Sequence, residues 1–153
     1  AVTWSFIGDS EAQAVGGGAW VVANPISEEL KVMRPSLLPG LIAAARRNLD
    51  RGAASVRLFE IGRRYLADAE RPAVTLILAG EQRPRTWQDG KAAAFSAFDA
   101  KAEVLALLAA AGAPTANLQS FADAGKQWHP GRSARLGLGP KTIVARFGEV
   151  HPA

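Results

Sequence analysis

Residues 24–68, NPISEELKVMRPSLLPGLIAAARRNLDRGAASVRLFEIGRRYLAD, contain the clearest helix and strand patterns in the sequence. Ser36 is a suitable N-cap, and Pro39 falls in the first turn, where its missing N–H has no helical partner to lose. Gly52 marks the end of the pattern. The spacing therefore predicts an amphipathic helix from Ser36 to Asp50. Its apolar positions are Leu38, Leu41, Ile42, Ala45 and Leu49.

The opposite side of this predicted helix is basic, because it carries Arg46, Arg47 and Arg51. The leucine side is expected to face the core, and the arginine side is left for solvent or for a partner. A solvated basic face is the plain structural interpretation, and a partner surface is the functional one.

The next pattern, VRLFEIGRRYL at residues 56–66, predicts a strand with apolar residues on both faces. Glu60 shares a face with Val56 and Leu58, which places a carboxylate among apolar side chains. A buried carboxylate needs a hydrogen-bonded partner of opposite charge. We expect that partner to be an arginine of the preceding helix, or Arg63 or Arg64.

The flanking sequence predicts further strands and helices. Strands are expected at residues 1–8, 19–24 and 116–121, and a short helix at residues 10–15, capped by Asp9 or Ser10. PAVTLILAG, residues 72–80, is almost continuously apolar, which predicts a central strand that is covered on both faces.

The C-terminal part predicts a second helix at residues 98–112, with Asp99 as its cap. Its buried stripe is expected to be Val104, Leu105, Leu108 and Ala111. WHPGRSA, residues 128–134, predicts a turn, and residues 134–150 predict a hairpin across Gly139-Pro140-Lys141. Strands and helices mix without a regular βαβ order, which favours an α+β fold with a mainly antiparallel sheet flanked by helices.

The totals indicate a globular chain. With 153 residues, 48% of them hydrophobic, it can form one domain with a substantial core. There is no cysteine, and no apolar run approaches the roughly 20 residues of a membrane helix, so we expect a cytoplasmic protein without a membrane partner. The net charge of +4 permits an anionic partner without requiring one.

The sequence contains no evident catalytic or metal-binding constellation. His129 and His151 are each followed by proline and have no second ligand at metal-binding spacing, so a single structural hydrogen bond is the simpler role. GLGPK, residues 137–141, lacks the spacing and the following helix of a phosphate loop and predicts a hairpin turn. The carboxylates are scattered without an acid–base pairing. The prediction is therefore no catalytic residue, no cofactor-binding residue and no metal site.

Several segments together resemble the β subunit of bacterial phenylalanyl-tRNA synthetase. They are TWSFI, NPISEELKVMRPSLLPGL, RNLDRG, VRLFEIGRRY, FDAKAEVLALL with the preceding Trp87, WHPGRSA and GEVHP, in the order found in that family. The resemblance spans nearly the whole chain. One departure is Pro35, where the family usually has threonine; proline should hold Arg34 extended and leave the helix start intact.

The resemblance implies a class II aminoacyl-tRNA synthetase-like core at residues 1–153, in the subunit that does not perform aminoacylation. In the similar catalytic α subunit, the pattern G-R-x-Y-R-x-D contributes an arginine that holds ATP. Here the run is GRRYLAD, residues 62–68, and Leu66 stands at that position. Leucine cannot donate hydrogen bonds to a phosphate, so the resemblance implies a catalytically degenerate domain that is inactive alone. It further implies a fragment that lacks preceding modules and the C-terminal end of the core.

The expected role is structural. The resemblance implies packing against the α subunit in a tetramer of two α and two β chains, which attaches phenylalanine to tRNA with ATP and magnesium bound outside this domain. Arg34, Arg46, Arg47 and Arg51 are the candidates for the subunit interface or for a tRNA contact. The alternative is a basic module that contacts tRNA directly. Against it, the aromatic residues are few and mostly in core-like positions, without an exposed stacking platform.

Overall fold

The computed structural model describes residues 1–151. The chain divides into two compact units, unit 1 before and unit 2 after the boundary between Ala93 and Ala94. Both units combine helices with antiparallel strands, which confirms the predicted α+β class. The elements are β1 (Phe6–Ile7), α1 (Asp9–Ala14), the 3-10 turn η1 (Glu28–Leu30), β2 (Val32–Met33), α2 (Leu38–Asp50), β3 (Ser55–Tyr65), β4 (Glu70–Arg83), β5 (Ala93–Ala94), α3 (Ala97–Ala110), β6 (Gln119–Phe121), β7 (Trp128–Gly139) and β8 (Thr142–Val150).

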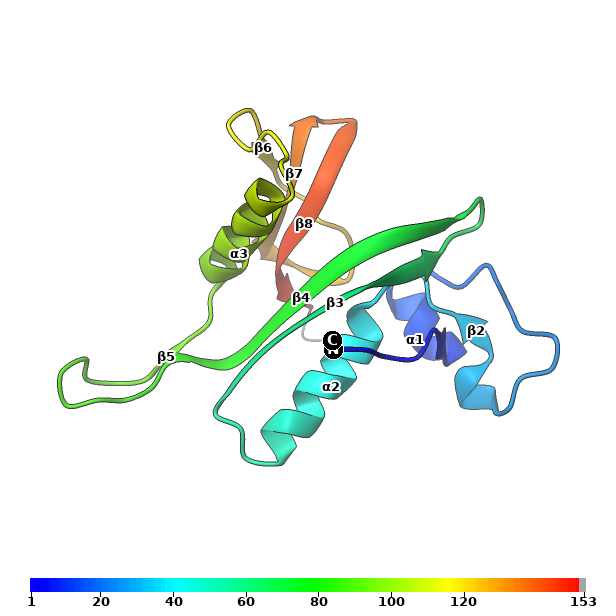
Figure 1. The fold of residues 1–153 in the computed structure, drawn as a ribbon, viewed down its shortest axis with the longest axis horizontal. Coiled ribbons are helices and arrows are strands. Elements are labelled where there is room, and N and C mark those ends of the chain that lie inside the picture. The colour runs from blue at the N-terminus through cyan, green and yellow to red at the C-terminus, as the bar shows by residue number, and fades with distance from the viewer. Residues whose placement is uncertain (152–153) are drawn as a thin grey trace. The chain divides into compact units, whose positions relative to one another are not determined.

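Unit 1 is built on a long hairpin of β3 and β4, against which α2 packs (Figure 1). The two strands pair without a register shift from Ser55 opposite Gly80 to Tyr65 opposite Glu70. The predicted strand at residues 56–66 is thus confirmed, except that Leu66 lies in the hairpin turn and not in the strand.

Helix α2 confirms the predicted helix with small differences. It begins at Leu38 and its N-cap is Leu37, not the predicted Ser36, although the hydroxyl of Ser36 accepts a hydrogen bond from the Leu38 N–H at 3.2 Å. The side that packs on β3 and β4 buries Leu37, Leu41 and Ala45. Of the other three predicted core positions, Leu38 is half-buried, and Ile42 and Leu49 are each 37% exposed. The buried stripe is therefore narrower than the apolar pattern.

The N-terminal segment differs most from the sequence prediction. Only Phe6–Ile7 of residues 1–8 form a strand, and β1 pairs with the short strand β2, which the pattern did not indicate. Of residues 19–24, Val21 alone forms a bridge, to Val32. The short helix α1 is confirmed, but its N-cap is Gly8 and not Asp9 or Ser10; the Glu11 carboxylate accepts the Gly8 N–H at 3.1 Å. Two-residue strands are fixed by tertiary contacts, so local alternation does not locate them.

Strand β4 was predicted to be covered on both faces, and this is wrong for the described residues. Its apolar residues are half-buried or exposed, and Val74 is 43% exposed. Helix α2 covers one face of the hairpin, and the side chains of the other face stay accessible. A continuous apolar run shows that both faces are apolar, and it does not show what covers them.

In unit 2, α3 packs against β8 in the antiparallel sheet β6-β7-β8 (Figure 1). The N-cap of α3 is Ser96 and not Asp99; the Asp99 carboxylate accepts the Ser96 N–H at 2.8 Å, which completes a capping box. Of the predicted stripe, only Val104 is buried. The α3 side that packs on the sheet is narrow, which leaves the other apolar positions partly accessible.

The predicted hairpin across Gly139-Pro140-Lys141 is confirmed by the pairing of β7 with β8. The predicted turn at residues 128–134 is wrong, because β7 already begins at Trp128. The Pro-Gly pair suggested a turn, but the chain accommodates it in an irregular register between Trp128 and Ser133.

Candidate functional site

A buried ion pair joins three parts of unit 1. Arg34, which follows β2, is 5% exposed, and Glu60 on β3 is 2% exposed. The Arg34 Nη1 donates to Glu60 Oε1 at 2.8 Å and to Thr3 Oγ1 at 2.8 Å, and the Thr3 hydroxyl donates to Glu60 Oε2 at 2.7 Å. Arg34 Nε donates to the Arg63 carbonyl at 3.0 Å. The network therefore fastens the N-terminal segment to β3.

Two glycines make room for this network. A Cβ on Gly62 would lie 2.7 Å from Arg34 Nη2, and a Cβ on Gly40 would lie 2.4 Å from Thr3 Oγ1. Side chains at these positions would displace the groups that reach Glu60. Gly62 lies in the GRRYLAD run and Gly40 in the first turn of α2. Both positions need glycine because Arg34 and Thr3 pack directly against their backbone.

The network keeps Glu60 ionised. Burial by itself raises the pKa of the Glu60 carboxyl, but the hydrogen bonds from Thr3 and Arg34, together with the Arg34 charge, outweigh it. The net result is a pKa below the ordinary value for glutamate. The carboxylate is thus a fixed anion that is already fully engaged by the protein.

This geometry corrects one prediction from the sequence. The partner of Glu60 is Arg34, and not an arginine of α2, Arg63 or Arg64. Because the Arg34 guanidinium is enclosed and committed to Glu60 and Thr3, it lies apart from the exposed arginines of α2. Arg34 therefore acts in the interior of unit 1, and the structure offers it no surface at which to meet a partner.

The other three candidate residues share the exposed side of α2. Arg46, Arg47 and Arg51 are all exposed. Arg46 lies 3.8 Å from Asp50, a long and solvent-exposed ion pair that contributes little to stability. Among the described residues, no ion pair joins Arg47 or Arg51 to a carboxylate. The three side chains form a basic surface, and we keep them as candidates for a partner contact.

Leu66 lies at the start of the β3–β4 turn, where its N–H donates to the Ala69 carbonyl at 3.0 Å. Two arginines around the turn are paired with carboxylates: Arg63 with Glu70, and Arg71 with Asp68 at 2.7 Å. Arg64 is half-buried and has no ion pair among the described residues. The hydrogen bond from Arg71 lowers the pKa of Asp68. Arg63 and Arg71 are therefore occupied by carboxylates, and the side chain of Leu66 has no hydrogen-bond donor that could bind a phosphate.

The side of the β3–β4 hairpin that α2 does not cover is apolar. We call it the outer face and define it by Phe59, Ile61, Val74, Leu76 and Leu78. Phe59 stands opposite Leu76, and Ile61 stands opposite Val74, so these side chains are cross-strand neighbours. Phe59 is 57% and Ile61 71% exposed. Exposed apolar residues that gather in this way are typical of contact surfaces.

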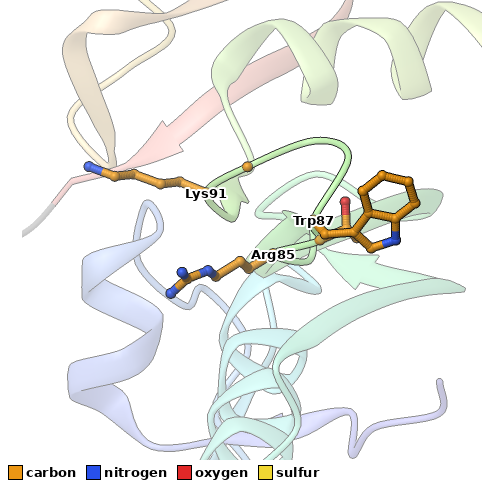
Figure 2. Close-up of a pocket in the computed structure, with 5 residues that line it drawn as sticks. Arg85, Trp87 and Lys91 are labelled. Atoms are coloured by element: carbon orange, nitrogen blue, oxygen red, sulfur yellow. The ribbon is translucent and has the colours of Figure 1, made fainter.

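A second exposed feature is the turn after β4. Trp87 at its tip is 91% exposed, and the hollow beside it is lined by Arg85, Thr86, Trp87, Gly90 and Lys91 (Figure 2). The aromatic residues are predicted to lie mostly in core-like positions without an exposed stacking platform, and the exposure of Trp87 contradicts that expectation at this turn. A lone aromatic in a polar segment, RPRTWQDGK, was the available signal.

The remaining sequence candidates have structural roles or stay as predictions. His129 Nδ1 accepts a hydrogen bond from the Gly131 N–H at 3.1 Å, which agrees with a single structural role. Pro152, in the GEVHP segment, lies outside the described residues. Within residues 1–151, no group of three or more His, Asp or Glu residues is arranged to hold a metal ion. The same residues include no helix that is long and apolar enough to cross a membrane.

The chain belongs to the family of phenylalanyl-tRNA synthetase β chain CLM domains, which it matches over residues 1–153. It is 60% identical over 153 residues to the phenylalanine–tRNA ligase β subunit of Zymomonas mobilis, and 61% identical over 160 residues to that of Novosphingobium aromaticivorans. The β subunit of Rhodospirillum rubrum is 50% identical over 159 residues. All of this chain is covered in each comparison, and it spans about a fifth (19–20%) of the length of these relatives.

Proposed function

We propose that the chain is a non-catalytic assembly domain of the β subunit of a phenylalanine–tRNA ligase. In this proposal it packs against the catalytic α subunit of a cytoplasmic enzyme with two α and two β chains. That enzyme attaches phenylalanine to its tRNA with ATP and magnesium, both bound outside this domain. Support comes from the family membership and from relatives that are β subunits of this ligase.

The outer face of the β3–β4 hairpin carries the proposal. Phe59 and Ile61 expose apolar surface on a regular, fully paired strand, so the surface is pre-formed. Burying such surface against a partner is favourable by about 25 cal/mol per Å² and needs no refolding. A subunit interface uses this kind of apolar centre with a polar rim. Substituting Phe59 and Ile61 by serine in the β subunit and measuring its association with the α subunit tests the proposal, which predicts weaker association.

We further propose that residues 1–153 belong to one class II synthetase-like core that has lost its ATP site. Antiparallel strands with helices packed on them are consistent with that core. The side chain of Leu66 has no hydrogen-bond donor for a phosphate, and Arg63 is already paired with Glu70. Titration calorimetry with ATP and magnesium should therefore show no binding. Micromolar, magnesium-dependent binding would remove the loss of the ATP site from the proposal.

The basic side of α2 supports a second candidate function, direct contact with tRNA. Arg46, Arg47 and Arg51 are exposed, and no strong ion pair among the described residues neutralises them. The same arginines can form the polar rim of the α-subunit contact. Substituting all three by glutamate separates these roles: weakened subunit association places them at the interface, and weakened tRNA binding by an intact tetramer places them on the RNA.

A further inference from the structure

The turn between β4 and β5 is held in one conformation by its own hydrogen bonds. The Asp89 N–H donates to Thr86 Oγ1 at 2.8 Å, and that hydroxyl donates to Asp89 Oδ2 at 2.9 Å. The Gly90 N–H donates to the Thr86 carbonyl at 3.0 Å, and Gly90 has a φ of +76°, which favours glycine. Trp87 therefore projects from an ordered turn and not from a loose loop.

Trp87 is 91% exposed, so the faces of its indole ring are open to a ligand. A tryptophan side chain combines a large apolar ring face with a polar N–H at its edge, which suits contacts that are half apolar and half wet. Because the turn fixes the backbone beside it, little conformational freedom is lost when a planar group stacks on this ring. A planar, apolar-faced group is the ligand that this side chain suits.

The charges around the turn are positive. Arg83, Arg85 and Lys91 are exposed, and the one carboxylate between Arg83 and Lys91 is that of Asp89, whose Oδ2 already accepts from Thr86. No ion pair among the described residues engages these three cations. Figure 2 shows Arg85 and Lys91 extending to the same side of the turn, while the indole of Trp87 projects to the other. Together with Thr86 and Gly90 these three side chains line an open hollow of about 510 Å³.

We propose that the segment from Arg83 to Lys91, the tryptophan turn, binds an unpaired stretch of RNA. Trp87 stacks on an unpaired base, and Arg85 and Lys91 contact the phosphates that lie across the turn. Stacking on aromatic rings combined with cations on the backbone is how proteins hold single-stranded nucleic acid. Three cations against one internally bonded carboxylate favour a polyanion over a protein surface, which would need several acidic groups to match them.

This inference rests on the proposed function for its RNA, because a phenylalanine–tRNA ligase meets tRNA with unpaired bases. It places an RNA contact at a site separate from α2. The test measures the affinity of tRNA for the complete β subunit, with and without the α subunit, by fluorescence anisotropy at several salt concentrations. Sedimentation of the same samples reports subunit assembly independently.

Trp87→Ala should weaken tRNA binding by about tenfold, and Trp87→Phe, which keeps an aromatic face, should retain most of it. Arg85→Gln with Lys91→Gln should reduce the slope of log affinity against log salt by about 1.5, as expected for two lost phosphate contacts. Trp4→Ala is the matched control, because it removes another tryptophan of unit 1 that is 76% exposed and should leave tRNA affinity unchanged.

Unchanged tRNA affinity in the Trp87→Ala and Arg85→Gln/Lys91→Gln proteins, with or without the α subunit, overturns the tryptophan turn as an RNA site. Release of the α subunit by Trp87→Ala with unaltered tRNA affinity also overturns it, and assigns the turn to a protein contact. Failure of the unaltered subunits to assemble contradicts the proposed function, and the measurement on the β subunit alone still decides the RNA inference.

Discussion

Replacing Arg34 by methionine should destabilise unit 1 strongly, because it leaves the Glu60 carboxylate buried without its cation. Methionine keeps much of the length of the side chain and removes the guanidinium. Glu60 is 2% exposed, so water cannot take over the role of Arg34 without opening the structure. The Thr3 hydroxyl at 2.7 Å remains as a donor, but it carries no charge.

The expected cost follows from the geometry of the pair. Removing one partner of a buried ion pair costs about 3–5 kcal/mol, since the remaining charge stays desolvated. The Arg63 carbonyl, which accepts from Arg34 Nε at 3.0 Å, also loses a donor. For a chain of this length, such a loss lowers the melting temperature by roughly 10 °C. It amounts to a large share of the about 5–15 kcal/mol that stabilises a typical domain.

Amide hydrogen exchange along β3, with urea unfolding in parallel, measures this cost for unit 1. The informative control is the double substitution Arg34→Met with Glu60→Met, which removes both charges. It should recover at least half of the lost free energy of unfolding, because an apolar pair in place of a buried ion pair is close to neutral. A cost below about 1 kcal/mol for Arg34→Met, or no recovery in the double variant, refutes the assigned role of the pair.

Three further predictions concern stability. Gly18→Ala should cost about 1–3 kcal/mol in thermal unfolding, because the new Cβ would lie 1.9 Å from the buried Val32 Cγ1; Gly139→Ala, which meets open space, is the control and should cost little. Ser96→Ala should cost about 1 kcal/mol through the lost cap of α3, seen as faster amide exchange in its first turn; unchanged exchange would count against the capping box. The lowered pKa of Glu60 makes its contribution complete above the ordinary glutamate pKa of about 4.3 and lost as pH falls through the folded-state pKa. Wild-type protein should therefore lose stability faster than Glu60→Gln as pH is lowered from about 5 to 3 in urea titrations, and parallel curves would contradict this.

The elements that local chemistry specifies could be predicted from the sequence. The apolar spacing before Gly52 predicts α2, the run VRLFEIGRRYL with apolar residues on both faces predicts β3, and Gly139-Pro140-Lys141 predicts the β7–β8 turn. Each of these patterns lies within one stretch of the chain, so the element can be predicted from that stretch alone.

The remaining features depend on contacts between distant segments. Arg34 and Glu60 are 26 residues apart, and no local pattern could choose Arg34 over the nearer Arg63 or Arg64. The apolar run at residues 72–80 predicts a strand covered on both faces, but the periodicity of a sequence does not show which element, if any, covers a face. The polar neighbours of Trp87 in the sequence indicate a loop, but the exposure of its ring depends on the conformation of the turn.

The central claim, that this domain is an assembly surface for the α subunit, is tested most directly on the outer face. Phe59→Ser with Ile61→Ser, made in the complete β subunit, should leave folding intact because both side chains are exposed. Ile26→Ser, at an apolar position of the same unit that is 96% exposed, is the matched control. The β subunit is mixed with the α subunit and examined by sedimentation velocity. The dissociation constant of the complex is predicted to be at least tenfold higher for the double variant than for wild type or the control, which corresponds to about 1.4 kcal/mol. Tetramers of unchanged stability in the double variant would contradict the account.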